Sequence, residues 1–378
     1  MVAMNTTRHR LMVVVGARPQ FVKAAAFHRA WVANPAWEIV WVHTGQHHDE
    51  ALSAQFFAEL GLPEPDEFFD VRRGSRGMRM GDMMAGVQLA IADHRPDAVL
   101  VFGDTDSTLA GAWAATAEGL PLIHIEAGLR SGLWSMPEEV NRVLTDRMSN
   151  VLVCPSDEAV GHLSSEGITH GWPGKGWPTH DARCVWKTGD IMHDNALHWS
   201  KDFPAETKAQ GPALMTMHRP SNVDDASRLW AWIEAIGGWA KQHGLLVKFP
   251  IHPRTAKVFQ STESDWKTSL QGHGIEPLPP LGYQDTLRSI HEAPLVLTDS
   301  GGVQKEAYSL GCRCVVMRST TEWVGQVREG QSVLVAEPRQ LESEATTLLH
   351  KGRSKVGDLY GDGCAAQTIV AALESMWA

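Results

Sequence analysis

The sequence contains few cysteines for its length. Five occur in 378 residues, namely Cys154, Cys184, Cys312, Cys314 and Cys364. A protein built on disulfides carries more of them at regular spacings, so we expect a chain from a reducing compartment. Cys312 and Cys314 lack the two-residue spacing of common zinc pairs, and no second pair follows them. We interpret both as apolar packing residues.

Long apolar runs are also absent. No segment has the length that a membrane-spanning helix requires, and residues 1–10 are polar, without the apolar core of a signal peptide. We therefore expect a cytoplasmic protein. Basic residues are in deficit, 34 Lys and Arg against 44 Asp and Glu, which gives a net charge of −10. Such a chain has no general attraction for nucleic acid or a membrane surface, so neither is an expected partner.

Three common catalytic signatures are missing as well. The absence of a Gly-x-Ser-x-Gly motif disfavours a serine hydrolase of that type. Without a P-loop or a Gly-x-Gly-x-x-Gly motif, neither ATP hydrolysis nor the use of NAD is indicated. The 18 histidines are scattered, with no metal-ligand spacing. The motifs therefore point to neither a metal ion, ATP nor NAD.

Tryptophan, in contrast, is abundant, with 15 residues. Several lie in segments with helical periodicity, where packing in a core is the default interpretation. We predict this for Trp31, Trp113, Trp230, Trp232 and Trp239.

Short apolar segments alternate with helical patterns through the first half of the chain. Buried strands are expected at residues 11–15, 38–42, 97–102, 122–125 and 151–154. Gly-Ala-Arg-Pro follows the first strand and leads into a helix that ends near Val32. An Ala-rich helix over residues 107–118 follows the third strand. Strands that alternate with helices predict a parallel sheet covered on both faces.

The same alternation restarts after residue 185. Strands are expected at residues 213–217, 246–251, 295–298 and 314–317, with a helix over residues 225–242. Residues 171–178 are rich in Gly, Trp and Pro and form neither a helix nor a central strand. This segment is either a surface loop or part of a linker between the halves.

The sequence therefore predicts an α/β protein with two doubly wound parallel sheets in series. Ligands of such sheets bind outside the carboxyl ends of the strands, and polar clusters follow the strand ends in both halves. Any single cluster is also consistent with an ordinary βα turn. Six clusters together favour a functional site, in a cleft between two domains.

The segment at residues 298–306, Thr-Asp-Ser-Gly-Gly-Val-Gln-Lys-Glu, has the strongest local signal. A strand stops, Gly301 and Gly302 allow close approach of the backbone, and a helix starts with Ser300 as its N-cap. The N–H groups and the positive end of that helix suit a diphosphate. One turn later, Glu306 is a natural acceptor for the hydroxyls of a ribose. Ser-Gly-Gly also occurs in plain turns, and Glu306 is also consistent with an ordinary charge near a helix start.

Acidic residues follow two strand ends in the first half. Asp104 comes just after the strand at residues 97–102, and Glu126 directly follows the strand at residues 122–125. Pro137 indicates a helix start that places Glu138 and Glu139 in the first turn, where the helix dipole stabilises them. That dipole is a sufficient structural reason for the Glu pair. Three acidic groups near strand ends nevertheless favour acid–base chemistry.

Basic groups occupy comparable places. Arg18 and Lys23 lie in and behind the first strand–helix loop, and His218 with Arg219 follows the first strand of the second half. A lone histidine after a strand is more often structural than catalytic. Next to an arginine and a proline, His218 is better interpreted as a contact to an anion, and Arg254 adds a further positive charge.

Taken in order, the motifs resemble those of the non-hydrolysing bacterial UDP-N-acetylglucosamine 2-epimerases. They are Gly-Ala-Arg-Pro-Gln-Phe-Val-Lys (16–23), His-Thr-Gly-Gln-His (43–47), Gly-Asp-Thr-Asp-Ser-Thr (103–108), His-Ile-Glu-Ala-Gly-Leu-Arg (124–130), Pro-Glu-Glu-Val-Asn-Arg (137–142), Thr-Gly-Asp (188–190), His-Arg (218–219), His-Pro (252–253), the segment 298–306 and Thr-Thr-Glu-Trp (320–323). The resemblance covers nearly the whole chain. Gly-Ala-Arg-Pro-Gln-Phe replaces the Gly-Thr-Arg-Pro-Glu of the best-known members and resembles a branch that includes UDP-2,3-diacetamido-2,3-dideoxyglucuronate 2-epimerases.

The resemblance implies a glycosyltransferase-B-like (GT-B-like) fold of two Rossmann-like domains. Residues 1–182 would form the N-terminal domain, completed by a C-terminal helix over residues 364–378. Residues 183–363 would form the UDP-binding domain. The family also implies a homodimer, a UDP-sugar as substrate, and no cofactor or metal.

The implied reaction interconverts UDP-GlcNAc and UDP-ManNAc for the synthesis of cell-surface polysaccharide precursors. UDP leaves C1 by anti elimination, a 2-acetamidoglucal forms, and re-addition of UDP inverts C2. The motifs carry over four catalytic residues: Asp104, Glu126, Glu138 and His218. They carry over nine substrate-binding residues: Arg18, Lys23, Arg142, Arg219, His252, Ser300, Gly301, Gly302 and Glu306. Gln46 and His47 resemble residues of a second, activating UDP-GlcNAc site.

Other functions fit the same motifs. A 2-epimerase of UDP-2,3-diacetamido-2,3-dideoxyglucuronate would use the same machinery on another sugar. A hydrolysing 2-epimerase would release ManNAc and UDP, and an inactive UDP-sugar-binding protein would bind without turnover. A glycosyltransferase of the same fold would need an acceptor site but not three clustered carboxylates.

Overall fold

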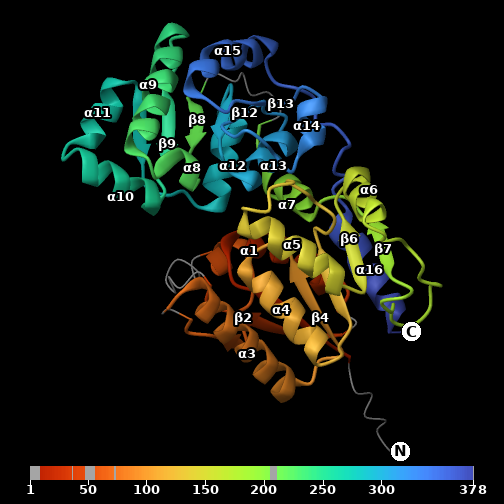
Figure 1. Cartoon of the computed structure of the whole chain (residues 1–378). Helices are drawn as coiled ribbons and strands as arrows, with labels where there is room; N and C mark the ends of the chain where they lie inside the picture. Colours follow the sequence, from red (N-terminus) through yellow and green to blue (C-terminus); the bar gives the residue numbers. More distant parts are fainter. Residues whose placement is uncertain (1–8, 36, 47–55, 72–73, 205–210, 378) are drawn as a thin grey trace, which may run out of the picture. The chain divides into compact units, whose positions relative to one another are not determined.

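The computed structural model describes residues 9–35, 37–46, 56–71, 74–204 and 211–377. They divide into two compact units, whose helices and strands are labelled in Figure 1. The first unit comprises the described residues up to Asn195 together with those from Tyr360 onward. The second unit is Ala196–Leu359. In the described part of the chain, no helix combines the length and the apolar character that crossing a membrane requires.

The first unit is built on a seven-stranded sheet in the order β3-β2-β1-β4-β5-β6-β7, with every pair parallel. The strands are β1 (Arg10–Val15), β2 (Glu38–His43), β3 (Glu67–Phe68), β4 (Ala98–Phe102), β5 (Leu122–Ile125), β6 (Val151–Cys154) and β7 (Cys184–Lys187). The helices are α1 (Arg18–Ala33), α3 (Arg76–His94), α4 (Asp106–Ala117), α5 (Pro137–Met148), α6 (Asp157–Ser165), α7 (Ile191–Ser200), which crosses the unit boundary, and α16 (Ala365–Met376).

The central strands of this sheet are buried on both faces, which explains their continuous apolar sequences. The side chains of Met12 and Val14 pack with residues of α3 and α4, so these helices cover one face. Phe21 and Phe27 of α1 are fully buried, and α16 packs against α1. Figure 1 shows α3, α4 and α5 side by side. A parallel sheet buried in this way needs no polar face.

The second unit contains a six-stranded parallel sheet in the order β10-β9-β8-β11-β12-β13. Its strands are β8 (Ala213–Thr216), β9 (Val247–Pro250), β10 (Ile275–Leu278), β11 (Val296–Thr298), β12 (Cys314–Val316) and β13 (Ser332–Leu334). Its helices are α8 (Pro220–Val223), α9 (Ala226–Gln242), α10 (Pro253–Thr262), α11 (Trp266–Gly272), α12 (Tyr283–Glu292), α13 (Gly301–Ser309), α14 (Val324–Arg328), η1 (Pro338–Gln340) and α15 (Leu341–Lys351).

Alternate side chains of these strands face two separate cores. Met215 and Leu297 pack with α9 and α15, whereas Leu214 and Val296 pack with α12 and α13. Each unit is thus a doubly wound parallel sheet, and the predicted α/β fold class is confirmed. In each sheet the strand order reverses once, between β1 and β4 in the first and between β8 and β11 in the second. Such reversal points are where ligands of these folds bind.

The unit boundary differs from the division expected at residues 182 and 183. β7 pairs with β6 as an edge strand of the first sheet, so the first unit continues to Asn195. The Gly/Trp/Pro segment at residues 171–178 lies inside this unit as a loop before β7. Trp172 Nε1 donates to Gly176 O over 2.9 Å, and the ring of Trp177 packs edge-on against Trp377, with the ring centroids 5.0 Å apart.

The interpretation of the tryptophans as core residues is partly wrong. Trp232 and Trp239 of α9 are buried, and Trp230 packs at the rim of that core. Trp31 is only half-buried, and Trp113 is 43% exposed. The helical periodicity placed Trp113 on α4 correctly but could not show that its position faces outward. Cys312 and Cys314 are buried free thiols, as expected.

Candidate functional site

The loops after β1 and β4 are joined by one buried glutamine. Gln20 Oε1 accepts hydrogen bonds from the N–H groups of Gly16 and Ala17, and Gln20 Nε2 donates to Phe102 O and Thr108 Oγ1. A Cβ atom at Gly16 would lie 2.1 Å from Thr44 Oγ1, so only glycine fits there. The reversal point of the first sheet is therefore held in a single arrangement.

Lys23 and Glu126 form a buried ion pair at this point. Lys23 Nζ lies 3.0 Å from Glu126 Oε1, and both side chains are almost completely buried. Glu126 has φ +74, in the left-handed region that glutamate rarely adopts. Strained backbone of this kind costs about 1–3 kcal/mol and gathers at functional sites. Gly103 follows β4 with φ +63, and a Cβ atom there would lie 2.8 Å from Lys23 Nζ.

Asp104 is held by the helix that begins at Pro137. Arg142 of α5 pairs with the Asp104 carboxylate through Nη2 and donates to Glu139 Oε2 over 2.8 Å through Nη1. Asn141 Nδ2 donates to Asp104 O over 2.9 Å. Arg142 is 2% exposed, so in this structure it positions Asp104. Asp104, Lys23 and Glu126 therefore all lie at the loop that follows β4.

The two glutamates in the first turn of α5 differ in their surroundings. Glu139 is buried, and its carboxylate accepts hydrogen bonds from Ser131 N, Gly132 N and Arg142 Nη1. Burial alone would raise its pKa, but these backbone donors and the Arg142 charge hold the pKa of Glu139 below its ordinary value. Glu139 is thus a structural anion. The predicted catalytic residue Glu138 is half-buried beside it.

The remaining predicted residues of the first unit lie around the same loops. Arg18 begins α1, with its guanidinium carbon 4.7 Å from the centroid of the Phe56 ring. Gln46 Oε1 accepts hydrogen bonds from Ser107 N and Ser107 Oγ, which fixes the start of α4. His47, the second residue of the expected activating site, lies outside the described residues.

In the second unit, Asp299 joins the loops that follow β8 and β11. Its buried carboxylate accepts hydrogen bonds from His218 N, Arg219 N and Asn222 Nδ2, at 2.9–3.1 Å. His218 Nδ1 lies 3.4 Å from Asp299 Oδ1, and the rings of His218 and His252 are 5.2 Å apart. The structure thus brings His218, Arg219 and His252 together. Asp299 was not predicted as a site residue from the sequence, although it stands directly before the Ser-Gly-Gly motif.

The N-terminus of α13 carries the expected diphosphate motif. Ser300 occupies the N-cap position, but its side chain makes no capping hydrogen bond, contrary to the expectation. Its own N–H donates to Thr298 Oγ1 instead. The helix begins at Gly301 and Gly302, whose N–H groups belong to the first turn and have no partner inside an α-helix. Backbone donors at such an end suit a phosphate.

Two further pairs beside this helix were not found from the sequence. Arg318 Nη1 donates to Glu322 Oε2 over 2.9 Å, and both side chains are buried. Lys305 Nζ lies 4.3 Å from the centroid of the Trp323 ring. A Cβ atom at Gly301 would lie 3.4 Å from Glu322 Oε1. The Thr-Thr-Glu-Trp motif therefore packs against the start of α13, a proximity that no spacing in the sequence reveals.

Glu306 is a buried carboxyl group one turn into α13. Its side chain is 6% exposed, and burial raises its pKa to about 7, opposed only by the charge of Lys305. A buried acid that costs stability is retained where function needs it. A carboxylate with this environment is suited to accept hydrogen bonds from ligand hydroxyls.

The raised pKa of Glu306 predicts a pH-dependent stability. The folded protein holds the proton more tightly than the unfolded chain, so the free energy of unfolding falls as the pH rises from about 4.5 to about 7. We expect Glu306→Gln to remove this loss, which amounts to roughly 1.4 kcal/mol per pH unit. Urea unfolding across this range measures it, with exposed Glu342→Gln as the control. Equal stability of wild type and Glu306→Gln above pH 7 would contradict the prediction.

The first unit thus gathers Arg18, Lys23, Gln46, Asp104, Glu126, Glu138 and Arg142 at its reversal point. The second unit gathers His218, Arg219, His252, Ser300, Gly301, Gly302 and Glu306 at its own. The first set contains the carboxylates of Asp104, Glu126 and Glu138, and the second contains a helix N-terminus with His218 and Arg219. Across the described ranges, no group of three His, Cys, Asp or Glu side chains is placed to hold a metal ion.

Comparison with known proteins gives consistent matches over nearly the full length. The family model described as UDP-N-acetylglucosamine 2-epimerase matches residues 29–374. UDP-2,3-diacetamido-2,3-dideoxy-D-glucuronate 2-epimerase of Pseudomonas aeruginosa is 39% identical over 95% of this chain and 98% of its own. A UDP-N-acetylglucosamine 2-epimerase homologue of Methanococcus maripaludis is 33% identical over 97% of this chain and 100% of its own. The crystal structure of Methanocaldococcus jannaschii UDP-GlcNAc 2-epimerase in complex with UDP-GlcNAc and UDP has a TM-score of 0.85 and 32% identity, covering 96% of this chain and 99% of that one.

Proposed function

Because the chain belongs to the UDP-N-acetylglucosamine 2-epimerase family, we propose that it inverts C2 of a UDP-linked 2-acetamido sugar. The observation that carries the proposal is that each unit holds a different set of polar groups. Strained, buried Glu126 stands beside Asp104 in the first unit, and a helix N-terminus with a buried glutamate stands in the second.

The proposed chemistry begins with loss of UDP from C1. The C2 proton is not next to a carbonyl, so direct deprotonation is difficult. Departure of UDP places positive charge on the ring and acidifies C2, and removal of the proton leaves a 2-acetamidoglucal. Protonation from the other face and return of UDP invert C2. Asp104, Glu126 and Glu138 transfer protons and stabilise the cationic ring.

The UDP moiety is assigned to the second set of residues. The N–H groups of Gly301 and Gly302 and the side-chain hydroxyl of Ser300 bind the diphosphate, and Glu306 binds the ribose hydroxyls. His218 and Arg219, held by Asp299, contribute positive charge to the departing diphosphate together with Arg18. Lys23, Arg142 and His252 complete the proposed substrate contacts.

Two sugars are candidates. UDP-GlcNAc is the substrate named for the M. jannaschii relative, and UDP-2,3-diacetamido-2,3-dideoxy-D-glucuronate is the one named for the P. aeruginosa relative. The higher identity of the second relative, 39% against 32%, favours the diacetamido sugar.

Proton NMR in deuterated water with each sugar nucleotide tests the proposal. A new UDP-sugar with inverted C2 and deuterium at C2 is the expected product. Free ManNAc with UDP would identify a hydrolysing enzyme instead. An unchanged C2 proton signal with both sugars, despite bound UDP, would overturn the proposal in favour of an inactive UDP-sugar-binding protein.

We also propose that the protein is a homodimer. Leu89 of α3, Trp113 of α4 and Leu144 of α5 are 68%, 43% and 43% exposed, on three helices that pack side by side (Figure 1). Exposed apolar side chains on adjacent helices are typical of an interaction surface. A second copy of the chain is the partner that the family resemblance favours.

Leu89→Glu is expected to weaken this dimer about 10- to 100-fold, because burying a leucine contributes about 1.5–3 kcal/mol. Sedimentation equilibrium over a concentration series measures the change. Leu246→Glu, at a 61% exposed leucine of the second unit, is the matched control. A wild-type protein that remains monomeric at every concentration would refute the dimer.

A further inference from the structure

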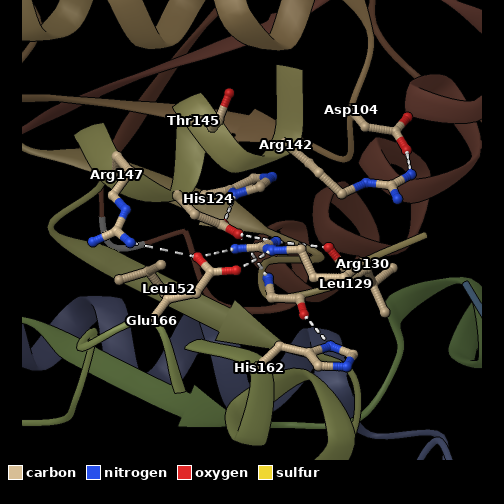
Figure 2. A network of polar contacts seen from close by, with 12 residues as sticks. Asp104, His124, Leu129, Arg130, Arg142, Thr145, Arg147, Leu152, His162 and Glu166 are labelled. Atoms are coloured by element: carbon tan, nitrogen blue, oxygen red, sulfur yellow. Dashed lines mark hydrogen bonds and ion pairs between the residues drawn. The ribbon is translucent and has the colours of Figure 1, made fainter. Parts of the chain in front are cut away.

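Beneath the loop that carries Asp104 lies a completely buried histidine. His124 of β5 has ring atom Nδ1 2.7 Å from Asp146 Oδ1 and ring atom Nε2 2.7 Å from Gly103 O. His124 and Asp146 are both 0% exposed. Figure 2 shows His124 within the polar network of this region. None of the roles assigned above uses either residue.

The partners of the ring determine its protonation state. Gly103 O is a carbonyl and only accepts, so Nε2 carries a proton. Asp146 Oδ2 accepts hydrogen bonds from Arg130 Nη1 and Gly128 N, and the guanidinium charge of Arg130 stabilises the ionised carboxylate. Burial alone would raise the pKa of Asp146, but His124 and Arg130 hold it below its ordinary value. An ionised Asp146 only accepts, so Nδ1 carries a proton as well, and His124 is an imidazolium.

The charge of His124 is balanced by a series of ion pairs in which positive and negative side chains alternate. Asp146 pairs with Arg130, and Arg130 donates to both oxygens of Glu166 over 2.6 and 2.9 Å (Figure 2). Arg147 also lies 3.8 Å from Glu166. On β6, burial and the nearby Asp146 charge raise the pKa of the Cys154 thiol, which is therefore neutral. Buried charges persist only when paired in this way.

The loop that receives the hydrogen bond from His124 contains the acid–base groups. Gly103 N donates to Ile125 O over 2.9 Å while its carbonyl accepts from His124, so Gly103 is fixed from both sides. Asp104 is the next residue. A Cβ atom at Gly103 would lie 3.5 Å from Glu126 Oε1. A shift of the Gly103 peptide therefore displaces Asp104 and disturbs the Lys23–Glu126 pair.

We propose that His124 is a positioning residue, an imidazolium that fixes the Gly103 carbonyl and thereby aligns Asp104 and Glu126 for proton transfer at C2. The role rests on the proposed function. Asp146, Arg130 and Glu166 keep the ring charged and in place.

The protonation state is tested on the wild-type protein without substrate. Nitrogen-15 NMR of histidine-labelled protein, with His124 assigned from the His124→Gln spectrum, is expected to show both ring nitrogens protonated at pH 7. Asp146→Asn removes the counter-charge at constant volume, and the signals of a doubly protonated His124 ring are then expected to be lost. A neutral His124 ring in the wild-type protein at pH 7 would overturn the inference.

The positioning role is tested by kinetics of His124→Gln on whichever UDP-sugar the wild-type protein epimerises. We expect kcat to fall about 100-fold, the cost of a displacement near 1 Å, while KM stays within about twofold. The acid limb of the kcat–pH profile is expected to move to higher pH, because the carboxylates lose a nearby positive charge. A purely structural defect would lower the amount of folded enzyme without moving that limb.

The control is His162→Gln. His162 Nδ1 also contacts a loop carbonyl, Gly128 O, over 3.0 Å, but this contact is only partly buried. It is expected to retain wild-type kcat and pH profile. Retention of both by His124→Gln would overturn the positioning role. Wild-type inactivity on every sugar would overturn the proposed function and the positioning role together, while the NMR result would still decide the protonation state.

Discussion

Replacing Glu126 by glutamine is expected to abolish epimerisation while UDP still binds. Glutamine keeps the size of the side chain but neither takes up nor releases a proton, so a loss of about 10²–10⁴-fold in kcat is expected. Glu126 is not among the proposed UDP contacts, all of which except Arg18 lie in the second unit, so the affinity for UDP is expected to remain within about twofold. Turnover is measured by NMR and UDP affinity by calorimetry.

The buried partner of Glu126 complicates this variant and supplies its control. Without the carboxylate, Lys23 is left as a buried charge, which costs about 3–5 kcal/mol in typical cases. The double variant Lys23→Met/Glu126→Gln is expected to recover stability but not turnover. Glu64→Gln, at an exposed glutamate of the same unit, controls for the loss of a surface charge. Near-normal turnover of Glu126→Gln would remove this residue from the catalytic set.

Gly301→Ala is expected to weaken UDP binding without harming the fold. The added methyl group would lie 3.4 Å from Glu322 Oε1 and 3.5 Å from Trp323 Nε1, which is ordinary contact. Alanine stabilises a helix by up to about 1 kcal/mol relative to glycine. The methyl group occupies the space where a phosphate approaches the backbone, and loss of a charge-assisted hydrogen bond costs about 1.5–3 kcal/mol. The dissociation constant is therefore expected to rise about 10- to 150-fold.

Gly301→Ala is informative because it is expected to raise the stability of the protein while lowering its affinity for UDP. Gly238→Ala in α9, where a Cβ atom would meet nothing within 4 Å, is expected to raise stability without changing UDP affinity. Calorimetric titration with UDP and urea unfolding measure the two quantities on each variant. An unchanged affinity of Gly301→Ala would place the diphosphate elsewhere.

The fold was predictable to the extent that its signals are local. Strands such as Leu122–Ile125 and Val151–Cys154 were expected with their observed bounds, because continuous apolar runs end at polar or Gly-rich turns. The short edge strands β3, β7, β10 and β13 were missed. β7 begins after the Gly/Trp/Pro loop, and its pairing with β6 supplies what its sequence does not indicate.

The candidate site was predictable residue by residue but not as a set of contacts. Asp104, Glu126 and His218 could be predicted because each follows the end of an apolar strand, a pattern that is visible in the local sequence. The pairing of Asp299 with His218 N spans 81 positions and has no such signature. The same holds for the burial of Arg142, since only the folded α5 places it between Glu139 and Asp104.

The return of the chain into the first unit bears on the order in which the protein forms during synthesis. Asp194 Oδ2 accepts a hydrogen bond from Ala366 N, and α16 packs against α1, so the first unit needs residues from both ends of the chain. The second unit is complete at Leu359, before α16 has left the ribosome. Although most of it is translated later, the second unit can therefore fold before the first is complete. Until α16 packs against α1, part of the surface of α1 stays exposed. That interval exposes apolar side chains of α1 to chaperones and to aggregation, and it ends only when α16 packs against α1.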